Sequence, residues 1–188
     1  MESLPVLTGG IDLVFSSLML QWYNDLDRAI AGTRRVLRAN GVFLFATMGP
    51  ETLWELRESW AHVDNDNHVH ALLDLHNIGD ALVRAGLEGV VMESEKITLN
   101  YQTCAHLMRD LKALGASNAV SSRHKGLTGR HKIRHVTQNY EKYRTGGLLP
   151  ATYEIIYGHA WAPLHAHLKP TAQTVFVPVE SLKRYHKK

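Results

Sequence analysis

Residues 11–46, IDLVFSSLMLQWYNDLDRAIAGTRRVLRANGVFLFA, decide the fold. The stretch opens and closes with runs at 11–15 and 42–46 that are apolar almost without interruption, as strands covered on both faces of a parallel sheet are. Between the runs, Asn24 or Asp25 caps a helix with apolar residues at helical spacing, and Asn40-Gly41 ends it. The order strand, helix, strand predicts a parallel crossover unit of an α/β domain.

Further elements are predicted around this unit. Helices are expected from Pro50 onward, after the cap Asp74, over 103–115 and over about 128–144, where Ile133, Val136, Tyr140 and Tyr143 form the buried stripe. The two later helices are interpreted as inserted or lid helices. Alternating residues in 90–101 predict a strand near a sheet edge, and 150–161 predicts a late strand with one wetter face.

The composition is that of one globular domain. The chain has 188 residues, 45% of them apolar, and a formal net charge of +3 that gathers in the C-terminal half. No apolar run is long enough to span a membrane, and the single cysteine, Cys104, excludes an intrachain disulfide. We expect a soluble, cytoplasmic protein with an acidic partner.

Five blocks carry a resemblance to a known family: IDLVFSSLMLQW, VLRANGVFLFATMGPETLWEL, DLHNIGDALVRAGL, LMRDLKALGASNA and LPATYEIIYGHAW. In this order, over about residues 1–163, they resemble the malonyl-acyl-carrier-protein O-methyltransferases of biotin synthesis, the BioC family. The first three blocks are common among Rossmann-like class I methyltransferases. The last two are more specific to this family.

The resemblance implies a truncated α/β Rossmann-like class I methyltransferase fold with inserted lid helices. Residues 1–163 would be its C-terminal part, with a helical insertion at about 103–147, and 164–188 a basic tail. In the family, three earlier strands hold the glycine-rich turn and the acidic residue that bind S-adenosylmethionine. Neither Thr8-Gly9-Gly10 nor 126–129 has the strand and helix around it that such a turn needs. The surviving cofactor wall would be Ser16, Ser17 and Leu18.

The same resemblance has a consequence for association. Residues 11–15 would lie in the middle of the complete sheet, so the truncation turns a central apolar strand into an edge with unpaired backbone groups. We therefore expect a companion polypeptide, a second copy, or a rearranged terminal segment of the chain itself to cover this edge.

Substrate residues also follow from the resemblance. Methyl transfer to a carboxylate needs alignment and no general base, so no catalytic residue is assigned. Arg109 and Lys112, three apart on a helix, would receive a malonyl carboxylate or thioester carbonyl, with solvated surface charges as the alternative. Tyr153 would offer its hydroxyl to the same pocket or pack in the core. Gln21 and Trp22 would shape the acceptor pocket, although simple packing is favoured for Trp22.

The basic stretch at 121–144 suits an acidic acyl-carrier protein or, alternatively, a merely soluble surface. Nucleic acid is not expected, because no helix-turn-helix, zinc finger or stacking platform is apparent. His62-Val63-Asp64, with His68 and His70, has weak metal-ligand spacing, and no metal site is assigned. Cys104, with no base nearby, is not expected to act as a nucleophile.

The expected function is S-adenosylmethionine-dependent methylation of the free carboxylate of malonyl-acyl-carrier protein. The chain alone is expected to be inactive because the cofactor motif is missing. One alternative is a protein that resembles the assembly hydroxylase of respiratory complex I, which shares some of the blocks. Another is a non-catalytic module that binds a carrier protein or a subunit.

Overall fold

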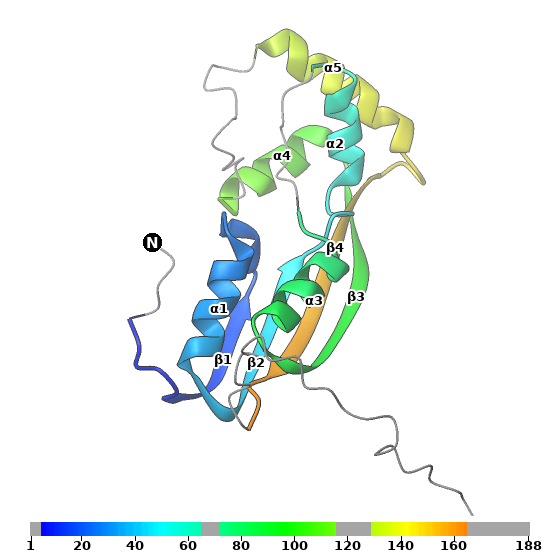
Figure 1. The fold of residues 1–188 in the computed structure, drawn as a ribbon. Coiled ribbons are helices and arrows are strands. Elements are labelled where there is room, and N and C mark those ends of the chain that lie inside the picture. Colours follow the sequence, from blue (N-terminus) through cyan, green and yellow to red (C-terminus); the bar gives the residue numbers. More distant parts are fainter. Residues whose placement is uncertain (1–4, 65–71, 116–128, 165–188) are drawn as a thin grey trace, which may run out of the picture.

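A computed structural model describes residues 5–64, 72–115 and 129–164, and its centre is a four-stranded sheet. The strands are β1 (Ile11–Ser17), β2 (Leu37–Met48), β3 (Glu88–Tyr101) and β4 (Leu149–Trp161), in the order β1-β2-β4-β3 (Figure 1). β1 pairs parallel with β2, whereas β4 runs antiparallel to both of its neighbours. The predicted parallel pair and the predicted edge position of β3 are confirmed.

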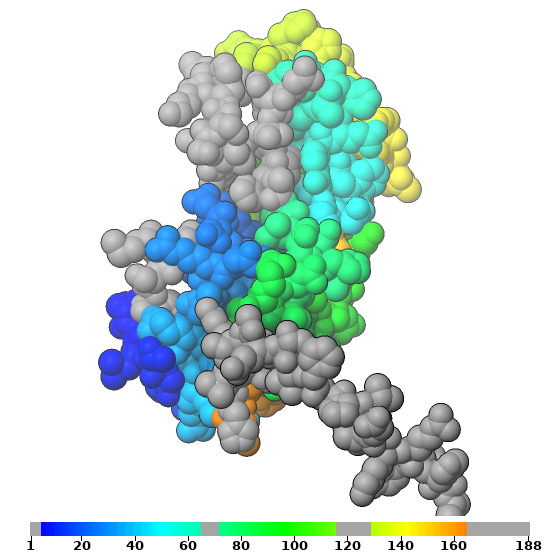
Figure 2. All heavy atoms as spheres, in the orientation of Figure 1, coloured from blue at the N-terminus to red at the C-terminus, as the bar shows by residue number. Residues whose placement is uncertain are grey.

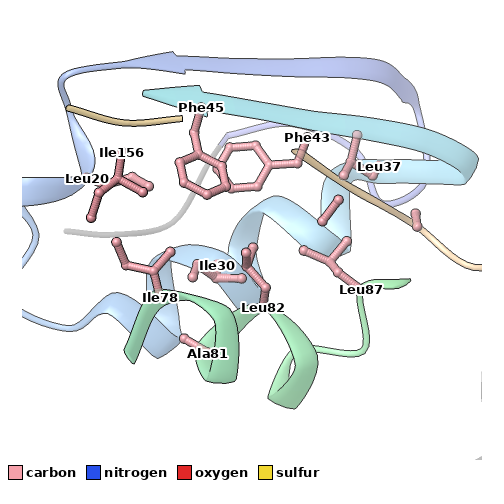
Figure 3. Close-up of a cluster of buried hydrophobic side chains, with 12 residues drawn as sticks. Leu20, Ile30, Leu37, Phe43, Phe45, Ile78, Ala81, Leu82, Leu87 and Ile156 are labelled. Carbon is pink, nitrogen blue, oxygen red and sulfur yellow. The ribbon is translucent and has the colours of Figure 1, made fainter. Parts of the chain in front are cut away.

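Two helices cover one face of the sheet. α1 (Leu26–Val36) and α3 (Leu75–Arg84) lie beside each other on this face (Figures 1 and 2). Each helix starts at a predicted cap, because the carboxylate of Asp25 accepts from the backbone N–H of Arg28 and that of Asp74 from Asn77. The apolar sheet core lies between helices and strands (Figure 3) and consists of Leu20, Ile30, Leu37, Phe43, Phe45, Ile78, Ala81, Leu82, Leu87, Ile156, Ala160 and Ala162.

Within the described residues, the opposite face of the sheet around β1 and β2 has no helix over it. Side chains alternate along a strand, so the neighbours of the buried residues point to this face. Phe15 is 67% exposed and Leu44, its partner on β2, is 37% exposed. We call this surface the bare face; its exposed apolar side chains are Leu13, Phe15, Leu44, Val91, Tyr157 and Trp161.

Three further helices form a cap beyond the end of β2. They are α2 (Trp54–Ala61), α4 (Cys104–Ala113) and α5 (Arg130–Tyr140), next to the part of the β3–β4 pair that extends past β2 (Figure 1). Two 3-10 turns accompany these elements, η1 (Leu20–Trp22) and η2 (Glu141–Tyr143). The cap core consists of Leu53, Leu56, Trp60, Cys104, Leu107, Val136, Tyr140, Leu149 and Ala151.

Buried polar groups join the cap to β4. The buried carboxylate of Glu55 accepts from the hydroxyl of Thr152 at 2.5 Å and from its backbone N–H at 3.2 Å. Glu154 accepts from the backbone N–H of Glu51 at 2.9 Å and from the hydroxyl of Ser94 at 2.7 Å. Because both carboxylates are engaged on each oxygen, the connection from β2 into α2 has a fixed path.

Some predicted boundaries were wrong. α1 ends at Val36 and β2 begins at Leu37, because the pairing of Ile11 with Leu37 draws these residues into the sheet. Asn40, with φ of +58°, interrupts this strand as a bulge and does not end the helix. α2 begins only after Leu53, which has φ of +54°, so Pro50 lies before the helix.

The basic helix is shorter than predicted. α5 ends at Tyr140, and Ile133 is 42% exposed because Val136 and Tyr140 form its buried side. Residues 165–188 of the predicted basic tail lie outside the described residues, and the domain division stays a prediction. None of the described helices has the length and apolar character needed to cross a membrane.

Candidate functional site at the carboxyl ends of β1 and β2

A pocket of about 290 Å³ lies where β1 and β2 end. The carboxyl edge of an α/β sheet is where ligands of such folds bind. η1 follows β1 here and brings Leu20 and Gln21 to the pocket, opposite the last residues of β2. The lining residues are Leu20, Gln21, Tyr23, Asn24, Leu26, Thr47, Met48, Leu72, Leu73 and Ile78.

The side chain of Gln21 is held at both ends of its amide. Its Nε2 donates to the carbonyl of Leu18 at 2.7 Å, and its Oε1 accepts from the hydroxyl of Thr47 at 3.0 Å. Thr47 is buried on β2, so the site is built on a strand of the sheet. The structure thus places Gln21, predicted to shape an acceptor pocket, in the pocket lining with a defined orientation.

The backbone at Leu18 is strained. Its φ of +52° lies in the left-handed region, which costs a non-glycine residue on the order of 1 kcal/mol. The backbone N–H of Leu18 donates to the carbonyl of Ala46 at 2.8 Å, which fixes the chain as it leaves β1. The turn directs the Leu18 carbonyl to Gln21.

Ser16 and Ser17 lie at the end of β1 on opposite faces. Ser16 is half-buried, whereas Ser17 is exposed beside a second, open cavity of about 480 Å³ on the bare face. The lining of this cavity also includes Phe15, Leu44 and Tyr157.

These residues fit S-adenosylmethionine in part only. The cofactor carries a ribose diol, a carboxylate and an amine, which need an acidic acceptor and several backbone or side-chain donors. Ser17 and the apolar residues near it supply one hydroxyl and a flat apolar wall. Ser16, Ser17 and Leu18 therefore form at most one wall of a cofactor site, and the described residues hold no glycine-rich strand-to-helix turn that would form the other.

Trp22 and Tyr153 lie outside the pocket lining. Trp22 is 44% exposed on η1, and its packing role stays a prediction. Tyr153 is half-buried against the cap core. Burial, followed by neighbouring Tyr101, raises the pKa of its phenol well above the ordinary value, so the hydroxyl keeps its proton at neutral pH.

Arg109 and Lys112 are exposed on α4, whose main contacts are with α5 and β3. Neither side chain makes an ion pair within the described part of the chain, and neither lines the pocket. The structure does not bring these two cations to Gln21.

Much of the basic surface is neutralised internally. Lys132 pairs with Asp64 at 2.7 Å, Lys142 with Glu58 at 2.7 Å, and Arg144 with Glu141 at 2.6 Å. In the described part of α5, Arg130 and Arg134 keep their charges free of such pairs. Arg123 and Lys125 lie outside the described residues.

Among the described residues, the side chains considered for metal binding or nucleophilic attack are engaged in contacts within the fold or buried. Asp64 is engaged by Lys132, and Nδ1 of His62 lies 2.7 Å from the carbonyl of Glu58. Over 5–64, 72–115 and 129–164, no three potential metal ligands gather; His68 and His70 are outside these ranges. Burial raises the pKa of the Cys104 thiol, which disfavours the thiolate that a nucleophile needs.

Several pocket residues were not predicted from the sequence. Thr47 ends an apolar strand, and Leu72 and Leu73 precede a helix, so neither pattern indicates a pocket. Only the three-dimensional pairing of β1 with β2 brings Thr47 next to Gln21.

Sequence comparison connects the chain to methyltransferases. The model of the methyltransferase domain family matches residues 1–45. Malonyl-[acyl-carrier protein] O-methyltransferases from Laribacter hongkongensis and Nitrosospira multiformis are each 49% identical over 163 and 162 residues, which is 87% and 86% of this chain and 55% and 53% of theirs. A Coxiella burnetii relative with the same activity in its name is 41% identical over 184 residues, 97% of this chain and 64% of that protein. The chain spans about half the length of the first two relatives.

Solved structures show the fold. A candidate methyltransferase from Bacillus halodurans C-125 superposes with a TM-score of 0.58 at 13% identity, over 86% of this chain and 68% of its own. The YcgJ protein of Bacillus subtilis gives 0.56 at 13% identity with the same two coverages. The described residues therefore have the α/β Rossmann-like fold of the class I methyltransferases.

Proposed function

We propose that this chain, a homologue of the malonyl-[acyl-carrier protein] O-methyltransferases, is the acceptor-binding part of an enzyme that methylates the free carboxylate of malonyl-acyl-carrier protein. The observation that carries the proposal is the 49% identity to two such enzymes over most of the chain. The pocket of about 290 Å³ at the carboxyl edge gives the small acceptor end a place to bind.

The chemistry asks the protein for alignment. A carboxylate is already a nucleophile and a sulfonium methyl group is already an electrophile, so holding them at attack distance supplies much of the acceleration. No general base is needed, and the neutral side chains of the pocket agree with this requirement.

The methyl donor of this class of enzyme is S-adenosylmethionine. Ser16, Ser17 and Leu18 would form one wall of its site, and polypeptide beyond the described residues would supply the other. The described residues by themselves would therefore bind the cofactor weakly.

The carrier protein would be held by the exposed cations. Arg109, Lys112, Arg130 and Arg134 lie on the cap without internal ion pairs among the described residues. Exposed charges mainly speed and steer association with an acidic partner, so binding of the carrier protein should weaken steeply as salt is added.

A chimaera tests this function. The chain replaces the segment that it matches in the Laribacter hongkongensis relative, and methylation of malonyl-acyl-carrier protein is followed by mass spectrometry. We expect the carrier protein to gain one methyl ester. A folded chimaera that binds S-adenosylmethionine and leaves malonyl-acyl-carrier protein unmodified would contradict the proposal.

We also propose that the edge of β1 and the bare face bind a polypeptide corresponding to the part of the relatives that this chain does not match. Within the described residues, the outer edge of β1 has no strand beside it, and Phe15 and Trp161 stand exposed on the bare face. A group of exposed apolar side chains on one face is typical of an interface. The unmatched length, close to half of each of the first two relatives, is enough for further strands and helices.

Light scattering tests this partner. Mixed with the unmatched segment of the Laribacter hongkongensis relative, the 188-residue chain should give a 1:1 complex, and Phe15→Asp should abolish it. Val83→Asp is the matched control, because Val83 is 63% exposed, close to the 67% of Phe15, and lies on α3 away from the bare face. A homodimer that persists in place of the 1:1 complex, or a complex that tolerates Phe15→Asp, would overturn the assignment.

A further inference from the structure

The pocket at the carboxyl edge is polar without being charged. Its lining residues among the described part of the chain are apolar or neutral, and its amide and hydroxyl groups come from Gln21, Asn24, Thr47 and Tyr23. From the described residues, a ligand in this pocket therefore meets hydrogen-bonding dipoles and no cationic side chain.

The orientation of the Gln21 amide is forced by its neighbours. The carbonyl of Leu18 can only accept, so it must face Nε2, and Oε1 must then face the hydroxyl of Thr47, which donates to it. A flipped amide would set two acceptors against each other. One N–H of Nε2 is used by Leu18, and the second N–H has no partner within the described residues.

The backbone supports this arrangement at a cost. Leu18 holds φ of +52°, a conformation that leucine rarely adopts, and strained residues of this kind cluster at functional sites. Without that conformation the Leu18 carbonyl would not stand opposite Nε2. Leu18 and Thr47 thus hold the Gln21 amide in one orientation at the pocket lining, with one N–H of Nε2 unused among the described residues.

We propose that the free N–H of Gln21 Nε2 binds one oxygen of the acceptor carboxylate and that Thr47 is the positioning residue that keeps this donor aimed at it. The inference rests on the proposed methyl transfer and specifies how its acceptor is held. It also assigns Arg109 and Lys112 to a place away from the reacting oxygen.

Charge balance explains why a neutral donor suits the reaction. The free carboxylate oxygen attacks the methyl carbon, the carbon–sulfur bond breaks with its electron pair going to sulfur, and no proton moves. A carboxylate anion and a sulfonium cation become a neutral ester and a neutral thioether. A lysine or arginine on the carboxylate would lose its attraction as the charge disappears, and so would bind the ground state better than the transition state. An amide N–H carries no net charge, so its attraction to the oxygen falls far less.

Side-chain amide signals in NMR spectra of the 188-residue chain provide the test. The probe is malonyl-N-acetylcysteamine, which has a free carboxylate; its methyl ester and acetyl-N-acetylcysteamine are the uncharged comparisons. We expect the Gln21 Nε2–H signals to move on titration with the acid. Signals of Gln138, exposed on α5, serve as the internal control.

Variants separate positioning from folding. Gln21→Glu should abolish binding of the acid, because it replaces the donor with an anion. Thr47→Val should weaken binding roughly five- to ten-fold, the usual effect of one lost hydrogen bond, and Thr47→Ser should restore it. Arg109→Gln and Lys112→Gln should leave the affinity for this small probe within about two-fold, as expected for exposed charges. The backbone amide spectrum of each variant reports whether the fold is intact.

Three results would overturn the inference: unchanged affinity in folded Gln21→Glu, unchanged affinity in folded Thr47→Val, or Gln21 signals that stay still as the acid is added. Failure of the proposed function looks different. The proposed function fails when a folded chimaera that binds S-adenosylmethionine leaves malonyl-acyl-carrier protein unmodified, whatever the Gln21 signals do. If the chimaera methylates malonyl-acyl-carrier protein equally well with Gln21→Glu, the function stands and the donor assignment fails.

Discussion

The sheet core and the cap core are built from different interactions. The sheet core is mainly apolar, with rings such as Phe43 and Phe45 packed at a centroid distance of 5.2 Å, and the buried polar side chains of this layer are Thr33 and Thr47. In the cap, buried polar groups lie beside the apolar cluster, and Glu55, Thr152 and Tyr140 are all hydrogen-bonded. The sheet core thus depends mainly on shape and volume, and the cap depends as well on the hydrogen bonds of Glu55, Thr152 and Tyr140.

This contrast predicts which substitutions each region tolerates. An apolar core loses stability in proportion to the cavity that a truncation leaves. A buried polar group behaves otherwise, because removing one hydrogen-bonding partner leaves the other buried without a partner and without water. Substitutions in the two regions should therefore differ in size and in their response to pH.

The largest effect is expected for Phe43→Ala. Phe43 is fully buried in the sheet core, whereas its neighbour Leu44 points to the bare face with 37% of its side chain exposed. Phe43→Ala should lower the free energy of unfolding by about 3–5 kcal/mol, and Leu44→Ala by less than about 1 kcal/mol. Urea denaturation of both variants checks this. Equal losses would mean that the bare face is buried in solution by another part of the protein.

A smaller loss is expected in the cap for Glu55→Ala. The side chain is 1% exposed and binds both the hydroxyl and the backbone N–H of Thr152. Its removal leaves that N–H unsatisfied in the interior, which should cost about 2–3 kcal/mol. Glu55→Gln keeps an acceptor and should cost less than half as much. If Gln and Ala destabilise equally, packing and not hydrogen bonding holds this junction.

Alkaline pH should weaken the cap specifically. Burial, with a contribution from Glu55, raises the pKa of Tyr140 far above its ordinary value, and its hydroxyl donates to the carbonyl of Pro150 at 2.8 Å. Above about pH 10 the unfolded chain loses this proton and the folded protein keeps it, so stability falls as pH rises, by up to about 1.4 kcal/mol per pH unit. Below that pH the contribution is constant.

The measurement is urea unfolding between pH 8 and pH 11 for the protein and for Tyr140→Phe. The variant should lose stability more slowly with rising pH, although not with zero slope, because burial also raises the pKa of Tyr153 and Cys104. Parallel curves for the two proteins would show that Tyr140 titrates normally in the folded state.

The sequence predicts much of the sheet layer because its signals are local. Caps at Asp25 and Asp74, apolar runs and a glycine at 86 are each visible within a few residues. The run at 42–46, however, predicts two covered faces, whereas the structure covers only that of Phe43 and Phe45. Whether both faces of an apolar strand are covered depends on distant chain, which local patterns do not record.

The candidate site is less predictable for the same reason. Gln21 was identified through a family resemblance, and its partner Thr47 lies 26 residues away on the neighbouring strand. The glycine in the block YGHAW likewise has no local explanation in the sequence. The structure supplies one, because a side chain at Gly158 would overlap the ring of Phe45 across the sheet. Both relations exist only once the strand register is known.

The smallest effect is expected where the two regions should behave alike. Asp74 is the N-terminal capping residue of α3, which covers the sheet core, and Thr103 is that of α4, which belongs to the three-helix cap. Each side-chain oxygen accepts from the backbone N–H three residues later, at 2.8 Å for Asp74 and 3.2 Å for Thr103. Both caps are exposed, so neither bond depends on the interior behind it. Asp74→Ala and Thr103→Ala should each cost about 1 kcal/mol.

Thermal unfolding of Asp74→Ala and Thr103→Ala, with Asp74→Asn and Thr103→Ser as conservative controls, measures whether the two losses of stability are equal. Glu55 and Thr103 share no hydrogen-bond partner. In the double variant, the losses in free energy of unfolding from Glu55→Ala and Thr103→Ala should therefore add without coupling. A Thr103→Ala loss several times that of Asp74→Ala would instead show that the start of α4 belongs to the same cooperative network as Glu55, and would extend the contrast between the two regions to the cap's surface.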